Sequence, residues 1–105
     1  MLLVSPPVII KQPTNDVIGL HSSITFECVV QGYGYINVEW RKLGSPLPNT
    51  AIKSSTNRTK GVSSILKITN VVGYYDGMYC CVANNMGGQT TSMYAKLSVQ
   101  GKHYS

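Results

Sequence analysis

The sequence is poor in charged side chains, and acidic ones are the scarcest: four Asp and Glu stand against nine Lys and Arg in 105 residues. Four scattered carboxylates do not suggest the pairs that general acid–base chemistry uses. His21 and His103 have no Cys or Ser partner nearby in the sequence, and His, Cys and acidic residues show no metal-ligand spacing. The sequence therefore predicts no enzyme, no metal site and no cofactor.

Long apolar runs and helical periodicity are also missing. No run approaches the roughly 20 residues that span a bilayer, and the apolar start at 1–4 is shorter than the core of a signal peptide. We expect residues 1–5 to be a leader or an added start, residues 6–100 one domain, and residues 101–105 a linker stub. These residues leave open whether the parent protein is secreted or membrane-anchored.

Basic residues are not clustered with aromatic ones, which argues against nucleic acid as a partner. The formal net charge of +5 serves solubility and also permits an acidic partner such as a sulfated glycan.

Against these absences stands a set of four residues at a distinctive spacing. Trp40 follows Cys28 by 12 residues, and Tyr79 stands two residues before Cys81. A Trp packed on a disulfide between two sheets, with a corner Tyr two residues before the second Cys, is typical of one β-sandwich.

Short alternating runs, separated by Gly, Pro, Asn and Ser, predict strands throughout the chain. On the run at 23–30, alternate apolar residues point one way, and Tyr79 and Cys81 share the inward row of a later strand. Residues 51–62 are polar and predict only a short strand. Residues 84–88 predict a hairpin turn, because Asn and Gly supply positive φ. The last strand is expected to close the sheet with Thr91, Met93, Ala95, Leu97 and Val99.

Taken together, these motifs resemble the I-set immunoglobulin domains over about residues 6–100. The matching motifs are Val17-x-Gly19, Ile24-x-Phe26-x-Cys28, Val38-x-Trp40-x-Lys42, Ser64-x-Leu66-x-Ile68, Gly77-x-Tyr79-x-Cys81-x-Ala83-x-Asn85 and Ala95-x-Leu97-x-Val99. The resemblance implies an all-β, two-sheet Greek-key sandwich with Trp40, Tyr79 and Leu66 in its core. It also leads us to expect Asp four residues before the corner Tyr, where this chain has Tyr75 and places the acid at Asp76. The ion pair that such an acid forms, here with Arg58 or Lys60, is therefore in doubt.

Three cysteines leave one unpaired if Cys28 and Cys81 form a disulfide, which implies an oxidising compartment. The alternative is a pair of buried thiols in a cytosolic domain. Cys80 is expected on the opposite face from Cys81, either as an intermolecular disulfide partner or as a partly covered, inert thiol. Asn57-Arg58-Thr59 is an acceptor sequence for N-glycosylation at Asn57.

Two surfaces are candidate interfaces. One is the pair of loops at 31–35 and 84–88, which carries Tyr33, Tyr35 and Met86; the alternative for Tyr35 is that it tucks into the core. The other is the outward face of the 77–83 strand and its neighbours, with Met78, Cys80, Val82 and Tyr94 as an apolar strip. A homodimer through that strip would bring two Cys80 residues together.

The resemblance leads us to expect an extracellular recognition module of a receptor or adhesion protein, which binds a protein ligand or a second copy of itself. One alternative is an intracellular structural module of a muscle-type giant protein. Another is a domain that binds sulfated glycosaminoglycans through Lys11, Lys67, Arg58 and Lys60.

Overall fold

The computed structural model describes residues 3–101, so that part of the expected leader, most of the linker stub and His103 lie outside the described residues. The described chain consists of nine strands and one turn of 3₁₀ helix, η1. Their bounds are β1 Val8–Lys11, β2 Asp16–Gly19, β3 Ile24–Gln31, β4 Asn37–Lys42, β5 Ala51–Arg58, β6 Gly61–Ile68, η1 Gly73–Tyr75, β7 Gly77–Asn85, β8 Gly88–Thr91 and β9 Ala95–Gln100.

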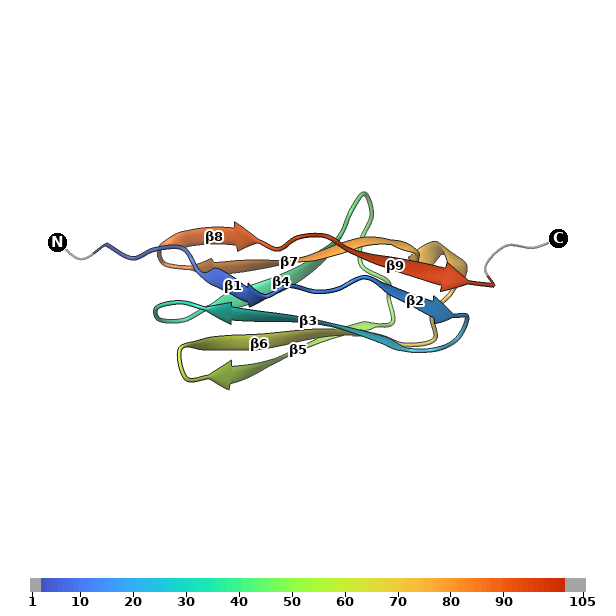
Figure 1. Ribbon diagram of the computed structural model, residues 1–105, viewed down its shortest axis with the longest axis horizontal. Helices are drawn as coiled ribbons and strands as arrows, with labels where there is room; N and C mark the ends of the chain where they lie inside the picture. Colours follow the sequence, from blue (N-terminus) through green and yellow to red (C-terminus); the bar gives the residue numbers. More distant parts are fainter. Residues whose placement is uncertain (1–2, 102–105) are drawn as a thin grey trace.

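The strands form two facing sheets (Figure 1). One sheet has the order β1-β3-β6-β5, and the other has the order β2-β9-β7-β4 with β8 paired to β7. All pairings are antiparallel except that of β2 with β9, which is parallel. The predicted all-β, two-sheet sandwich is confirmed.

Apolar residues at alternate positions of both sheets face each other and form the core. The predicted disulfide between Cys28 and Cys81 joins the sheets at its centre, with the two Cα atoms 6.6 Å apart. Trp40 packs beside it, donating its indole N–H to the Ser64 hydroxyl at 2.9 Å. Leu66 and Tyr79 are fully buried in the same cluster.

A buried tyrosine ties the start of β7 to η1. The Tyr79 hydroxyl donates to the Tyr75 carbonyl at 2.5 Å, which is the corner expected from the resemblance. Burial, helped by Tyr75 and Asp76, raises the pKa of Tyr79 well above its ordinary range, so the hydroxyl keeps the proton that it donates.

Asp76 takes part in the fold at this end of the sandwich. Its carboxylate accepts the backbone N–H of Val99 on β9 at 2.9 Å. Arg58 and Lys60 lie at the opposite end, around the turn between β5 and β6, so they are not its ion-pair partners (Figure 1).

Two expectations about strands were wrong. The polar region expected to hold one short strand contains all eight residues of β5, which pairs with β6 along its whole length. Because β5 is an edge strand with both sides largely exposed, it needs no alternation of apolar residues.

The last strand is not continuous. It breaks at residues 92–94 into β8 and β9, because Ser92 turns inward and exchanges hydrogen bonds with the backbone of Cys81. The break shifts the alternation by one residue, so Thr91 and Met93 are exposed while Ala95, Leu97 and Val99 point into the core.

Within residues 3–101, no helix has the length and apolarity needed to cross a bilayer.

Candidate functional site

One end of the sandwich carries large exposed side chains on its loops. We call it the open end; it comprises the N-terminal segment 3–7, the β3–β4 loop at 32–36, the β5–β6 turn at 58–61 and the β7–β8 turn at 85–88 (Figure 1). Tyr33 is 61% exposed, Tyr35 82% and Met86 76%. Tyr35 therefore does not tuck into the core; its neighbour Ile36 takes that place at 6% exposure.

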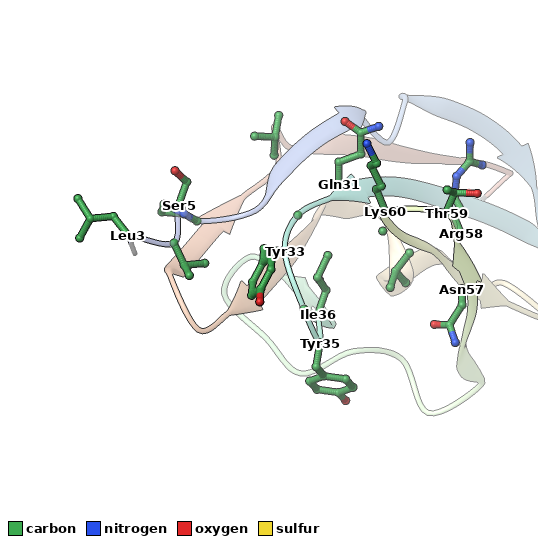
Figure 2. A pocket seen from close by; sticks show the side chains of 17 residues that line it. Leu3, Ser5, Gln31, Tyr33, Tyr35, Ile36, Asn57, Arg58, Thr59 and Lys60 are labelled. Atoms are coloured by element: carbon green, nitrogen blue, oxygen red, sulfur yellow. The ribbon is translucent and has the colours of Figure 1, made fainter. Parts of the chain in front are cut away.

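A groove with a volume of about 1030 Å³ runs across the open end. In Figure 2 it lies between the N-terminal segment, with Leu3 and Ser5, and the turn that carries Lys60 and Arg58. The β3–β4 loop, with Tyr33, lies between these two walls. The groove therefore combines segments that are far apart in the sequence.

Asn85 fastens the N-terminal wall of the groove. Its side-chain amide N–H group donates to the carbonyls of Ser5 at 3.1 Å and Tyr33 at 3.3 Å, while its side-chain oxygen accepts the N–H of Gly87 at 2.8 Å. One side chain thus joins the N-terminal segment, the β3–β4 loop and the β7–β8 turn. From the sequence, Asn85 is predicted only as part of the hairpin turn at 84–88; its place at the end of the Cys81-x-Ala83-x-Asn85 motif is the one sign of a further role.

Glycines let the backbone segments approach closely at both walls. A Cβ at Gly87 would lie 2.4 Å from the carbonyl oxygens of Val4 and Ser5. A Cβ at Gly61 would lie 1.9 Å from the carbonyl oxygen of Val30. In addition, the N–H of Gly32 donates to the Lys60 carbonyl at 2.9 Å, which fixes the β5–β6 turn to the β3–β4 loop. The groove is therefore held by the fold and does not need a ligand to form.

The groove is basic on one side. Arg58 and Lys60 are exposed on the β5–β6 turn, and none of the described residues that line the groove is acidic. Apolar and aromatic side chains make up much of the remaining lining: Leu3, Val4, Val8, Tyr33, Ile36 and Val62.

Tyr35 separates this groove from a second, smaller hollow. That hollow has a volume of about 320 Å³ and is lined by Tyr35, Asn37, Asn84, Asn85 and Met86. The exposed Tyr35 side chain therefore borders both hollows.

The second candidate surface, the outer face of β7, differs from its prediction. Cys80 is only 4% exposed and Val82 only 1%, so the two do not form a solvent-facing strip. β7 is flanked by β4 on one side and by β8 and β9 on the other, and larger side chains from these neighbours cover its small residues. Met78 is half-buried and Tyr94 is 47% exposed.

Above Cys80 and Val82 remains a shallow hollow of about 330 Å³, bordered by Arg41, Leu43, Thr91 and Tyr94. Burial raises the pKa of the Cys80 thiol, with Arg41 opposing, so the neutral and unreactive form is favoured. Of the two alternatives for Cys80, the structure supports the covered, inert thiol, and the predicted Cys80 bridge between two copies has no accessible sulfur to use.

The basic residues proposed to bind sulfated glycans do not form a continuous stripe. The ammonium group of Lys11 pairs with Glu27 at 2.6 Å, and Glu27 also accepts the Ser63 hydroxyl at 2.8 Å. These two hydrogen bonds lower the pKa of Glu27, so this carboxylate stays charged in the middle of the face. It would repel a sulfate placed between Lys11 and the other cations.

Asn57 lies near the end of the edge strand β5, is exposed, and lines the groove beside Arg58. Its side chain is accessible to a modifying enzyme. Among residues 3–101 no cluster of His, Cys, Asp and Glu has the geometry of a metal site.

Comparison with known proteins identifies the family of the chain. The family model described as the immunoglobulin domain matches residues 6–85. Hemicentin-1 of Mus musculus is 32% identical over 92 residues, which cover 84% of this chain and 2% of that protein. Roundabout homolog 1 of Homo sapiens is 33% identical over 94 residues, which cover 90% of this chain and 5% of that protein.

Relatives also include muscle proteins. Muscle M-line assembly protein unc-89 of Caenorhabditis elegans is 34% identical over 88 residues, which cover 83% of this chain and 1% of that protein. Among solved structures, a complex of titin M10 with obscurin-like 1 aligns with a TM-score of 0.75 at 26% identity, covering 90% of this chain and 94% of the solved one. The chain thus spans only about 1–5% of the length of these curated relatives.

Proposed function

The chain belongs to the immunoglobulin-domain family, and from this premise we propose that it is an extracellular recognition module of a cell-surface receptor or adhesion protein. Immunoglobulin domains are non-catalytic modules, so its activity is binding. The observation that carries the proposal is the open end, where Tyr33, Tyr35 and Met86 project from a disulfide-bonded frame.

Exposed tyrosines on a fixed frame suit protein recognition. A Tyr ring buries a large area on binding and loses few rotatable bonds, and its hydroxyl adapts to polar partners. At the open end the loops are fixed by Asn85 and by the bond between Gly32 and Lys60, so little ordering remains when a partner binds. The supported partner is another protein.

An extracellular location is supported by two features of the chain. A disulfide between Cys28 and Cys81 persists in oxidising compartments and is rare in the cytosol. The second feature is the acceptor sequence Asn57-Arg58-Thr59 on the exposed edge strand β5. A glycan there would cover a free strand edge whose backbone otherwise invites pairing with another chain. Digestion of secreted protein with peptide N-glycanase should reduce its mass by one glycan, and Asn57→Gln should abolish that change.

The second candidate function is an intracellular structural module of a muscle protein, which the likeness to unc-89 and to titin favours. The redox state of the cysteines distinguishes the extracellular function from the intracellular one. Native protein isolated from its tissue should show one free thiol, Cys80, if the domain is extracellular, and three if it is cytosolic. The assay needs a denaturant, because Cys80 is buried.

The remaining alternatives have less support. Sulfated-glycan binding is disfavoured by Glu27 on the basic face. Homophilic pairing through the face of Met78 and Tyr94 loses its apolar centre because Cys80 and Val82 are buried. Two open ends would also repel each other through Arg58 and Lys60.

A binding panel with a matched pair of variants tests the proposal. The immobilised chain is exposed to a panel of secreted ectodomains, a second copy of the chain and a heparin octasaccharide. Tyr35→Ser should abolish any protein binding, while Tyr74→Ser should leave it unchanged, since Tyr74 is equally exposed, at 77%, but lies on η1 at the other end. Binding that survives Tyr35→Ser, or binding of heparin alone, would contradict the proposal.

A further inference from the structure

The chemistry of the groove at the open end specifies the partner more narrowly than exposed tyrosines do. We propose that the groove binds an extended acidic segment of the protein partner, with apolar side chains that insert between its two walls. This inference rests on the proposed function and assigns to the same end the charge and shape of what it binds.

The charge of the segment follows from the groove wall on the β5–β6 turn. Arg58 and Lys60 are both exposed there, and neither forms an ion pair with a described residue. The described residues that line the groove include no acid. Glu27, whose charge interacts with that of Arg58, is already paired with Lys11. Two cations without an ion-pair partner among the described residues create a positive potential that an acidic side chain can satisfy at little desolvation cost, because all these groups remain at the rim.

The apolar character follows from the floor and the opposite wall. Ile36 and Val62 are almost fully buried at the base of the groove, whereas Leu3, Val8 and Tyr33 are exposed around it. A ligand without apolar groups would leave these side chains in water. This lining favours a peptide over a sulfated glycan, whose recognition requires a longer run of cations than the two present here.

The extended form of the segment follows from the shape of the groove. It is an open channel between the N-terminal segment and the β5–β6 turn and not an enclosed pocket (Figure 2). Its walls are pinned by Asn85 and by the Gly32–Lys60 hydrogen bond, so they do not close over a folded ligand. A chain that lies along the channel can place alternate side chains toward the floor and toward the cations.

Selection from a random dodecapeptide display library tests this inference without an identified partner. The target is the folded chain produced without N-glycans, so that a glycan on Asn57 does not block the groove. We expect the selected peptides to be enriched in Asp and Glu next to Leu, Ile, Phe or Tyr. A parallel selection on Arg58→Glu/Lys60→Glu should instead enrich Lys and Arg.

A matched control distinguishes the effect of charge in the groove from the effect of the net charge of the protein. Lys67→Glu/Lys96→Glu changes the net charge by the same amount on exposed lysines outside the groove. Measured by fluorescence anisotropy, a selected acidic peptide should bind about 100-fold more weakly to Arg58→Glu/Lys60→Glu and within about threefold of wild type to the control. Unchanged melting temperatures would show that all variants are folded.

Amide chemical shifts locate the bound peptide and distinguish the possible failures. Shifts at 32–36 and 58–62 are expected. Peptides without acidic bias that bind there would overturn this inference but leave the proposed function standing. Peptides that bind only the outer face of β7 would overturn both. Failure to select any peptide, with heparin octasaccharide shifting the same amides, would assign the groove to sulfated glycans and overturn the inference.

Discussion

The two ends of the sandwich differ in where their large aromatic side chains lie, although polar side chains bind backbone at both. At the end that holds the β2–β3 turn, η1 and the end of β9, which we call the closed end, polar side chains bind backbone: Tyr79 to the Tyr75 carbonyl, Asp76 to the Val99 amide and Lys42 to the Tyr74 carbonyl at 2.7 Å. At the open end such bonds fix the walls of the groove, and the rings of Tyr33 and Tyr35 project into solvent.

Both ends rest on one core, yet only the closed end uses its large aromatic residues to complete the fold. Tyr75 and Tyr79 are buried there, at 4% and 0% exposure. If the open end binds the partner as proposed, substitutions at the two ends should separate the free energy of unfolding from binding. The following predictions test that separation, beginning with the core that both ends share.

Trp40→Ala should have the largest effect and should destabilise both ends together. Trp40 is 5% exposed, packs against Phe26 and donates to Ser64. Removing it leaves a large cavity and an unpaired hydroxyl, which should cost about 3–5 kcal/mol of the free energy of unfolding. Urea denaturation measures this cost, and a loss below about 1 kcal/mol would show that the core does not depend on this residue.

A matched pair of hydroxyl deletions compares the ends directly. Tyr79→Phe removes the donor to a buried carbonyl at the closed end and should cost about 1–3 kcal/mol. Tyr33→Phe at the open end should change the free energy of unfolding by less than about 0.5 kcal/mol, because the ring is exposed. If thermal unfolding showed the same loss of stability for both variants, the two ends would not differ in their contribution to the free energy of unfolding.

Asn85→Ala tests whether the hydrogen bonds that hold the open end are independent of the closed end. The variant loses the bonds to Ser5 and Tyr33 and the acceptor for the Gly87 amide, and should cost about 1 kcal/mol. Amide hydrogen exchange should accelerate at Gly87 and stay unchanged at Val99. Faster exchange at Val99 as well would mean that the ends are not independent.

The smallest effect is expected on the face between the ends. The pKa of Glu27 is lowered by its bonds to Lys11 and Ser63, so its stabilisation is present above the pKa that it has in the unfolded chain and is lost as pH falls through the lower, folded value. The side chain of Glu27 is partly exposed, so the contribution is at most about 1 kcal/mol. Glu27→Gln should therefore reduce the loss of stability between neutral and acidic pH, as measured by urea denaturation at each pH; an unchanged pH dependence would exclude this role.

The features that could be predicted from sequence are those fixed by buried residues. The positions of Cys28, Trp40, Tyr79 and Cys81 indicated the fold, because a disulfide, a packed Trp and a corner Tyr require that spacing. The outer face could not be predicted as well. Alternation correctly placed Cys80 and Val82 opposite Cys81, but it says nothing of neighbouring side chains that cover an outward residue.

The length of the edge strand β5 and the break between β8 and β9 could not be predicted from the alternation of apolar residues either. The length of β5 is set by pairing with β6, which a polar sequence does not reveal. The break at Ser92 depends on two hydrogen bonds with the Cys81 backbone, which is distant in the sequence. The groove depends on the β3–β4 loop, the β5–β6 turn and the N-terminal segment. Tyr33, Tyr35, Asn57, Arg58 and Lys60 were named in advance, but nothing in the sequence indicated that they line one groove.

The most direct test of the assignment of recognition to the open end is a hydrogen-exchange footprint of the chain bound to a partner ectodomain from the binding panel. We expect slower exchange at 32–36, 58–61 and 85–88, with no change at 73–76 on the closed end. Protection confined to 73–76, or to the outer face of β4 and β7, would contradict this assignment.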